Sequence, residues 1–195
     1  MESSDGYAHS VQLYDIIYRH EDYVQEVNAL IDLIRQHERR QSRSLLDVAC
    51  GTGNHLRLLR DAGFDGAGLE RNSDMLAIAR AKLPAAPLHQ GDMRDFNLHQ
   101  RFDVVTCLRS SIAYVQPEVG LRAALAAMAR HVAPGGLLSV EPWTYPEVAG
   151  RDRVTVFGAS WDLPNLKIAH YHVSQIEDGC SLLDFHFMVA RPGEI

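Results

Sequence analysis

The sequence contains few cysteines, no long apolar run and no excess of basic residues, and each of these shortages excludes a class of protein. Three scattered cysteines are too few for a disulfide framework or a cysteine-based zinc site. No stretch of about eighteen apolar residues occurs, so we predict no transmembrane helix and no membrane partner. Acidic residues outnumber Lys and Arg by 25 to 19, which argues against a nucleic-acid partner because such surfaces cluster basic side chains.

The N-terminus and the histidines give two further exclusions. Residues 1–6 carry neither a basic start nor an apolar run, so they do not resemble a secretory signal, and we expect a cytoplasmic location. The ten histidines show neither H-x-x-H nor H-E-x-x-H spacing, so we predict no metal site. What is present is an ordinary globular composition, 46% apolar and 23% charged, over 195 residues. That length suits one domain, or one domain with a small appendage.

The order of apolar patterns predicts an α/β fold. Apolar residues at three- and four-residue steps predict helix over residues 10–40, divided near residues 19–21. Compact apolar runs then alternate with helical patterns. The predicted strands are 44–49, 66–70, 87–89, 101–108 and 137–141, and the predicted helices are 55–62, 73–80 and 118–132. This alternation indicates a Rossmann-like, doubly wound, mostly parallel sheet with helices on both faces.

The pattern changes after Trp143. Residues 154–160, 167–176 and 181–190 are typical of longer strands, and Glu177-Asp178-Gly179 is a hairpin signal. We therefore predict an antiparallel meander at the C-terminal end. The chain then divides into an N-terminal helical lid (1–43), a ligand-binding core (44–143) and an antiparallel strand appendage (144–195) on the substrate side or at a dimer contact.

The first predicted strand runs into the segment Asp47-Val48-Ala49-Cys50-Gly51-Thr52-Gly53. In an open parallel sheet, ligands lie beyond the carboxyl ends of the strands. Glycines there let the backbone approach a ligand closely, and the N-terminus of the next helix attracts a negative group. An acidic residue before the turn suits an ammonium group, so the loop fits an amino-acid moiety. A dinucleotide loop would place a third glycine where Asn54 stands, which disfavours a nicotinamide oxidoreductase.

Two further acidic residues follow the next two predicted strands. Glu70, 23 residues after Asp47, can accept hydrogen bonds from both hydroxyls of a ribose. Asp92 can accept from an adenine amine, and Met75 and Met93 can flank the flat ring with polarizable sulfur. Amino acid, ribose and adenine, in that order along one sheet edge, describe S-adenosylmethionine.

These motifs resemble those of the class I S-adenosylmethionine-dependent methyltransferases. The residues that carry the resemblance lie within 10–143, and they are 47–53, Glu70, 91–93, 102–105 and 134–136. Within that superfamily, Tyr14-Asp15-x-x-Tyr18 and residues 91–96, 110–112 and 140–143 are similar to the aminosugar N,N-dimethyltransferases of macrolide biosynthesis. The resemblance implies S-adenosyl-L-methionine as cofactor and N-methylation of an amino sugar or a similar natural-product amine. O-methylation of a small-molecule hydroxyl and a catalytically inactive cofactor-binding protein remain alternatives.

The resemblance also sets an expectation for the end of the sheet. The family core usually has seven strands, and the pattern here lacks the last two, which predicts a truncated chain or a shortened relative. A sheet edge left unpaired needs a cover or a second copy of the chain, so a homodimer is one expectation.

The motifs and the resemblance together assign roles to individual residues. Cofactor binding is assigned to Tyr14, Asp47, Ala49, Gly51, Gly53, Glu70, Arg71, Met75, Asp92, Met93 and Leu108. The substrate pocket is assigned to Tyr18, Arg109, Ser110, Trp143 and Tyr145, and catalysis to Tyr114 and Glu141, with His9 as a further candidate base.

Several of these assignments have a plainer alternative. Tyr14 and Tyr18 can fold over the cofactor as a lid or can simply pack their helix. Tyr114 stands where the relatives commonly have a histidine, and with a usual pKa of about 10 it is a poorer base. Arg109 stands where the relatives prefer an apolar residue. It either binds an acidic substrate group or forms an ordinary surface ion pair.

Overall fold

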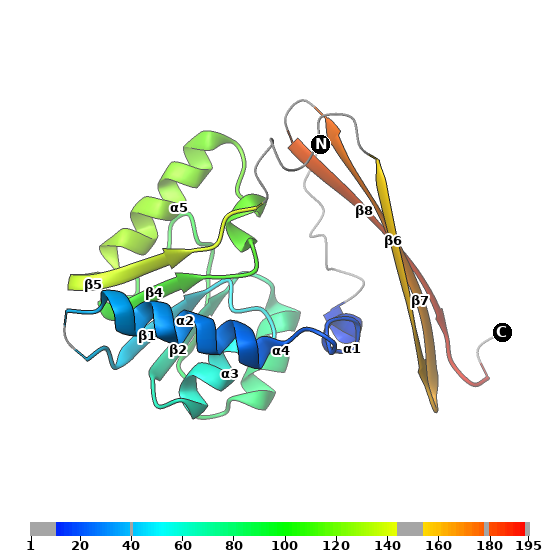
Figure 1. Cartoon of the computed structure of the whole chain (residues 1–195), viewed down its shortest axis with the longest axis horizontal. Helices are drawn as coiled ribbons and strands as arrows, with labels where there is room; N and C mark the ends of the chain where they lie inside the picture. Colours follow the sequence, from blue (N-terminus) through cyan, green and yellow to red (C-terminus); the bar gives the residue numbers. More distant parts are fainter. Residues whose placement is uncertain (1–10, 40, 144–153, 178–179, 194–195) are drawn as a thin grey trace. The chain divides into compact units, whose positions relative to one another are not determined.

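The computed structural model describes residues 11–39, 41–143, 154–177 and 180–193, and it divides the chain into two compact units, 1–143 and 144–195 (Figure 1). Each unit has its own sheet. No helix within the described residues is long and apolar enough to cross a membrane.

The first unit is a parallel sheet of five strands in the order β3-β2-β1-β4-β5. The strands are β1 (Ser44–Val48), β2 (Asp65–Glu70), β3 (Leu88–Gln90), β4 (Phe102–Cys107) and β5 (Val132–Val140). The helices are η1 (Val11–Leu13), α1 (Tyr14–Ile17), α2 (Tyr23–His37), α3 (Asn54–Asp61), α4 (Ser73–Lys82), η2 (Ser111–Tyr114) and α5 (Glu118–Arg130). The predicted fold class is therefore confirmed, including the break between the first two helices.

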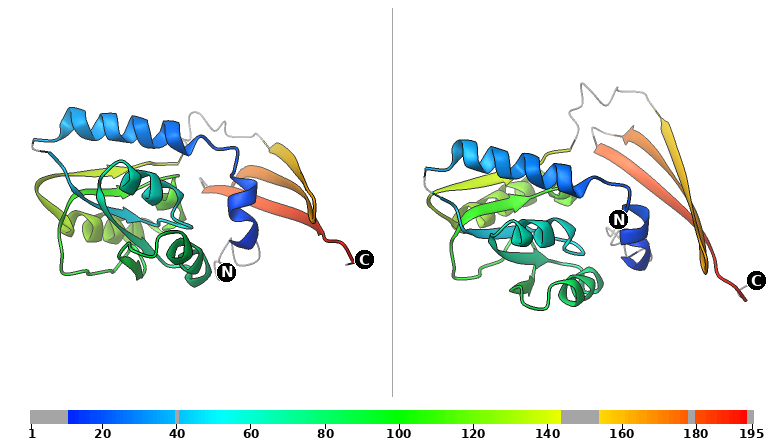
Figure 2. Two further views of the ribbon diagram at one scale, coloured as in Figure 1. Left: turned by 90° about the horizontal axis from the view of Figure 1, so that it is seen from below. Right: turned by 60° about the horizontal axis from the view of Figure 1, so that its bottom comes forward.

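Successive residues of the central strand point to opposite faces of the sheet, and different helices cover them. Leu45 belongs to a core with Val27 and Ile34 of α2 and with Leu56 of α3. Leu46 belongs to a second core with apolar residues of α5, among them Met128. Figure 2 shows α2 lying lengthwise over its face of the sheet. The helix α2 thus helps to form the core of the first unit, and the lid interpretation of residues 1–43 stays a prediction.

The strand β5 begins earlier than the sequence pattern predicts. It starts at Val132, which pairs with Phe102, and the register then shifts before Val104 pairs with Leu137. The segment 134–136 therefore lies inside the strand at this irregularity, and Gly135 adopts a positive φ of 77° there. The pattern placed the start at residue 137 because Pro and Gly are usual strand breakers, whereas an irregular edge strand tolerates them.

The second unit is an antiparallel sheet in the order β6-β7-β8, as predicted (Figure 2). Its strands are β6 (Thr155–Leu163), β7 (Leu166–Glu177) and β8 (Cys180–Ala190). The predicted hairpin turn includes residues 178–179, which lie outside the described residues, but Glu177 pairs with Cys180 on either side of it. The register places aromatic and imidazole rings on one face, namely Phe157, Trp161, His170, His172, Phe185 and Phe187.

Candidate active site

The site lies where the strand order of the five-stranded sheet reverses, between β1 and β4. Ligands of open α/β sheets bind at this point, beyond the carboxyl ends of the strands. Asp47 of β1 pairs with Thr106 of β4, and the Thr106 hydroxyl donates a hydrogen bond of 2.9 Å to Asp47 Oδ1. Asp47 is only 2% exposed, and burial raises its pKa to about 6 although His55 and Thr106 favour the ionised form. A cationic ligand group beside this carboxylate would relieve that cost.

The loop after β1 has the tight backbone that its glycines predict. Gly51 and Gly53 adopt φ values of +55° and +82°, and Ala49 also adopts a positive φ of +58°. A side chain on Gly53 would place its Cβ 3.1 Å from Leu83 Cδ1, so this position lacks space as well as conformational freedom. A Cβ on Gly51 would lie 3.9 Å from Met75 Sδ, which shows that the buried Met75 lies against the loop.

Glu70 connects the end of β2 to this loop. Its carboxylate is 8% exposed, and it accepts hydrogen bonds from the backbone N–H of Gly51 at 2.9 Å and of Asn72 at 2.8 Å. Asn72 in turn caps α4 by accepting from two backbone N–H groups. Two backbone amides thus orient the Glu70 carboxylate before any ligand binds.

Asp92 follows β3 and is more heavily paired than the sequence suggests. Arg94 donates to it from the backbone N–H at 2.9 Å, from Nε at 2.9 Å and from Nη2 at 2.6 Å. These bonds, opposed only by partial burial, lower the pKa of Asp92. Arg71 approaches Asp92 to 3.9 Å with a side chain that is 53% exposed. Met93 and Leu108, also assigned to the cofactor site, pack on the two apolar cores of the unit.

Asp15 of α1 contacts the glycine loop, and the sequence motif alone did not predict this role. Its Oδ1 accepts from the Thr52 hydroxyl at 2.7 Å and from the Asn54 side-chain amide at 3.0 Å. Its Oδ2 lies 2.6 Å from Lys82 Nζ. Burial opposes ionisation of Asp15, but these three donors lower its pKa overall.

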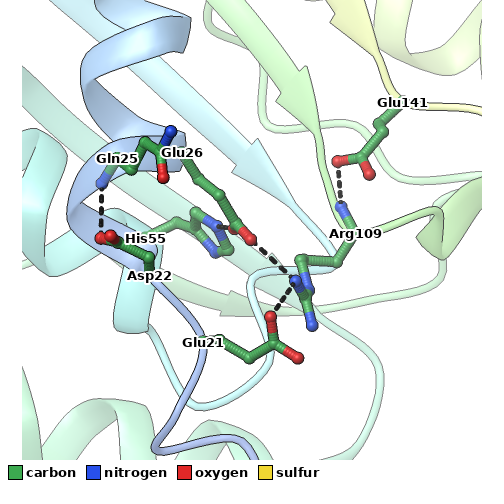
Figure 3. A network of polar contacts seen from close by, with 7 residues as sticks. All are labelled: Glu21, Asp22, Gln25, Glu26, His55, Arg109 and Glu141. Atoms are coloured by element: carbon green, nitrogen blue, oxygen red, sulfur yellow. Dashed lines mark hydrogen bonds and ion pairs between the residues drawn. The ribbon is translucent and has the colours of Figure 1, made fainter.

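Arg109, at the end of β4, is held by carboxylates from the N-terminal part of the chain (Figure 3). Its Nη1 lies 2.8 Å from Glu26 Oε1 and 3.1 Å from Glu21 Oε2. His55 contacts the other oxygen of Glu26 at 2.7 Å. Burial disfavours the charge of Arg109, but the two glutamates raise its pKa above the usual value. Arg109 therefore already has two anionic partners, and sequence reasoning did not foresee Glu21, Glu26 or His55.

Three tyrosines gather around this arginine. The rings of Tyr14 and Tyr18 are 4.5 Å apart, and the guanidinium carbon of Arg109 lies 5.9 Å from the Tyr18 ring and 6.0 Å from the Tyr23 ring. Burial, together with Tyr23 and Tyr18, raises the pKa of Tyr14 well above its usual value, and Tyr114 contributes to this shift. The phenol of Tyr14 is therefore neutral at physiological pH. Tyr114 itself is 63% exposed.

The ends of β4 and β5 are tied together. Arg109 and Ser110 adopt positive φ values of 52° and 55°, conformations that cost energy outside glycine. The Arg109 backbone N–H donates to Glu141 Oε2 at 2.7 Å, and the Ser110 hydroxyl donates to the Pro142 carbonyl at 3.0 Å. Trp143 follows with 41% exposure. Tyr145 and His9 lie outside the described residues.

The structure thus brings the predicted cofactor residues of β1, β2 and β3 to one edge of the sheet, and it places Tyr14, Tyr18 and Arg109 together beside that edge. The roles assigned to these residues, including catalysis by Tyr114 and Glu141, stay predictions.

A family model described as a methyltransferase domain matches residues 45–136 of this chain. A dTDP-3-amino-3,4,6-trideoxy-alpha-D-glucopyranose N,N-dimethyltransferase from Streptomyces venezuelae is 42% identical over 184 residues, which cover 93% of this chain and 76% of the relative. A dTDP-3-amino-3,6-dideoxy-alpha-D-glucopyranose N,N-dimethyltransferase from Streptomyces fradiae is also 42% identical, over 93% of this chain and 71% of the relative.

Solved structures give the same result. The crystal structure of Streptomyces venezuelae DesVI matches with a TM-score of 0.85 and 40% identity, over 94% of this chain and 77% of that one. CalS10, an amino pentose methyltransferase from Micromonospora echinaspora solved with S-adenosylmethionine bound, matches with a TM-score of 0.76 and 33% identity, over 92% of this chain and 81% of that one. The resemblance stated from the motifs is confirmed.

Proposed function

This chain belongs to the methyltransferase family that includes the dTDP-aminosugar N,N-dimethyltransferases, and from this premise we propose that it N-methylates the amine of a nucleotide-linked amino sugar with S-adenosylmethionine as methyl donor. The observation that carries the proposal is the placement of Asp47, Glu70 and the glycine loop at the switch point of the sheet. Relatives that match more than nine-tenths of this chain act on sugars of this class, as their names state.

The residues present fit this cofactor by chemistry. Asp47 is a buried carboxylate whose raised pKa would return toward normal beside an ammonium group. Glu70 is fixed by two amides, as an acceptor for a ribose diol should be. Gly51 leaves the loop without a side chain beside Met75, and Gly53 allows the tight turn to pack closely against Leu83. Asp92, beyond the next strand, is an anionic acceptor suited to an adenine amine.

When bound, S-adenosylmethionine supplies an electrophilic methyl group on a good leaving group, so the protein needs little covalent chemistry of its own. Its residues must hold the acceptor nitrogen in line with that methyl group and exclude water, and such orientation is worth about 7–11 kcal/mol in favourable systems. In this proposal Tyr18, beside Arg109, forms one wall of the acceptor pocket, and Tyr14, whose ring is 4.5 Å from that of Tyr18, contacts the cofactor.

The acceptor amine must be neutral when it attacks. Tyr14 cannot serve as the base near neutral pH, because its pKa is raised and its phenol keeps the proton. We assign the proton to Glu141, with Tyr114 and bulk water as the other acceptors. Glu141 already accepts from the Arg109 backbone, which holds its carboxylate at the end of β5.

Two measurements test the proposal. Calorimetric titration with S-adenosylhomocysteine should show saturable binding, and no heat at millimolar cofactor would exclude the cofactor assignment. Incubation with a dTDP-linked amino sugar should then add 14 or 28 mass units to the acceptor. A mass shift only with hydroxyl acceptors would establish O-methylation instead. Cofactor binding without turnover of either amine or hydroxyl acceptors would establish a non-catalytic protein.

Location and assembly are part of the same proposal. We place the protein in the cytoplasm, where the thiols of its three cysteines would stay reduced. We also propose a homodimer through the second unit, because Val156, Phe157 and Met188 of its two edge strands are exposed by 68%, 58% and 70%. Light scattering behind a sizing column measures the mass, and a monomer at micromolar concentration would exclude the dimer.

A further inference from the structure

Asp15 stands out because one partly exposed carboxylate meets three donors from separate parts of the fold. Thr52 belongs to the glycine loop, Asn54 is the first residue of α3, and Lys82 is the last residue of α4. Lys82 Nζ also donates to Asn54 Oδ1 at 2.8 Å, so the donors are linked to one another. The Asp15 carboxylate therefore contacts the glycine loop and the two helices, α3 and α4, that lie next to it.

The contact with Thr52 depends on the conformation of the loop. Thr52 is 1% exposed and lies between Gly51 and Gly53, whose positive φ values define the turn. Its hydroxyl reaches Asp15 at 2.7 Å only because the turn points it there. A change in the loop backbone would move the hydroxyl and break the bond.

The short helix α1, with its C-cap residue, carries two tyrosines beside Asp15. Tyr14 is the first residue of α1 and precedes Asp15, and Tyr18 is the residue that follows the end of this helix. Both rings lie beside Arg109, at the end of β4. In segment 11–18 the side chains of Val11 and Leu13 are also buried. These apolar contacts hold the segment to the protein, but they do not depend on the conformation of the glycine loop. Asp15 is thus the polar link between the loop and the position of Tyr14.

On the basis of the proposed cofactor binding, we infer that Asp15 is a positioning residue that couples the glycine loop to helix α1, so that cofactor binding at the loop and placement of Tyr14 and Tyr18 beside Arg109 occur together. Coupling of this kind is reciprocal. If the cofactor stabilises the loop conformation that Asp15 recognises, then the Asp15 contacts strengthen cofactor binding by the same factor.

A plain surface ion pair between Asp15 and Lys82 is the competing explanation, and two substitutions separate the two. D15N keeps the shape of the side chain but removes its charge. T52V removes only the hydroxyl bond to the loop and leaves the ion pair intact. D61N is the matched control, because Asp61 pairs with Arg57 at 3.1 Å on the exposed side of α3.

Two readouts are needed, and neither is catalytic activity. The first is the dissociation constant for S-adenosylhomocysteine by calorimetry. The second is amide hydrogen exchange of residues 11–18 with and without that ligand. In the unchanged protein the ligand should slow exchange in this segment. D15N and T52V should bind about tenfold more weakly, as expected for loss of a hydrogen bond to a charged group, and should lose the slowing. D61N should behave as the unchanged protein.

The outcomes are distinguishable. If both variants bind within twofold of the unchanged protein and the ligand still slows exchange at 11–18, Asp15 forms only an ion pair and the inference is wrong. If D15N fails to fold, T52V alone decides between the same two results. If the unchanged protein gives no heat with S-adenosylhomocysteine, the proposed cofactor is wrong and the coupling fails with it.

Discussion

Two buried histidines, one in each unit, have similar aromatic neighbours and opposite hydrogen bonding. His131 of the first unit is 2% exposed and stacks on Phe96 at 4.3 Å, and His170 of the second unit is 6% exposed and stacks on Phe187 at 4.7 Å. His131 Nδ1 contacts the Ala127 carbonyl at 2.7 Å, and its Nε2 accepts from the Leu98 N–H at 2.9 Å. Neither ring nitrogen of His170 has a hydrogen-bond partner.

The same contrast extends to other buried polar groups. On the ring-bearing face of the second sheet, Trp161 Nε1 and His172 Nδ1 are also buried without a partner. Among the described side chains of the first unit, only the Tyr23 hydroxyl is in that position. Buried polar groups without partners cost free energy. The first unit therefore pairs most of its buried polar groups, whereas four buried side-chain nitrogens on this face of the second sheet have no hydrogen-bond partner.

The largest effect should come from removing a site carboxylate from the first unit. Glu70→Ala removes a charge and the acceptor for two backbone amides, so S-adenosylhomocysteine should bind about a hundredfold more weakly, or about 3 kcal/mol. Glu70→Gln, which keeps an oxygen, should lose less. The measurement is calorimetric titration.

The control for this change is a carboxylate of the second unit. Asp184 is 75% exposed and pairs with His186, and Asp184→Asn should leave cofactor affinity unchanged. Equal losses of S-adenosylhomocysteine affinity in the Glu70 and Asp184 variants would contradict our proposal that the cofactor binds to the first unit.

The two histidines give the next prediction, with opposite signs. His131→Phe should lower the free energy of unfolding by about 2 kcal/mol, because the Leu98 N–H and the Ala127 carbonyl lose their partner inside the protein. His170→Phe removes two unpaired nitrogens and should stabilise its sheet by about 1 kcal/mol. Because two units need not unfold together, local hydrogen exchange in α5 and β7 is the appropriate measurement. Loss of stability in both variants would mean that His170 has a partner in solution.

The pH dependence of the second unit follows from the same residue. Burial, with a smaller contribution from His172, lowers the pKa of His170 in the folded protein. The unfolded chain therefore takes up protons first as the pH falls below its usual value of about 6.5, and the sheet loses stability from that pH downward. The protection factors of the β7 amides, in which the intrinsic pH dependence of amide exchange is divided out, should fall as the pH drops below about 6.5, and His170→Phe should reduce that fall. His186→Phe, on the opposite face with a side chain 43% exposed, is the control and should not.

The sequence predicts the framework of the first unit and much of its site because both follow from local pattern. Asp47, Glu70 and Asp92 each lie near the end of a predicted strand, and parallel strands bring their carboxyl ends to one edge. Contacts between distant segments leave no such pattern. Thr52 and Asp15 are 37 residues apart, and Arg109 and Glu26 are 83 apart, and only the folded chain brings them together.

In the second unit the sequence predicts the strands but not the burial and hydrogen bonding of their side chains. The sequence pattern predicted its strands to within a few residues, and the strand register determines which side chains share a face. Such a pattern does not show whether a face is buried or whether a histidine on it has a hydrogen-bond partner. His170 was therefore not singled out by the sequence, although its orphaned nitrogens are the clearest energetic feature of the sheet.

The smallest effect concerns the ion pairs of two arginines in the first unit, which test whether paired polar groups stabilise that unit. Arg109, with a side chain 28% exposed, meets two glutamates, whereas Arg122 on α5 is 77% exposed and meets Glu118 alone. Arg109→Met leaves Glu21 without its cation and Glu26 with His55 as its remaining partner, so stability should fall by about 1 kcal/mol at low salt. Arg122→Met should change it by less than about 0.5 kcal/mol. Thermal melts at two salt concentrations measure both, because added salt should screen the ion pairs of the unchanged protein and so reduce the loss in the Arg109 variant. If both variants change the stability equally and negligibly, the ion pairs of Arg109 are ordinary surface contacts. The position of Arg109 beside Tyr18 would then not depend on these charges.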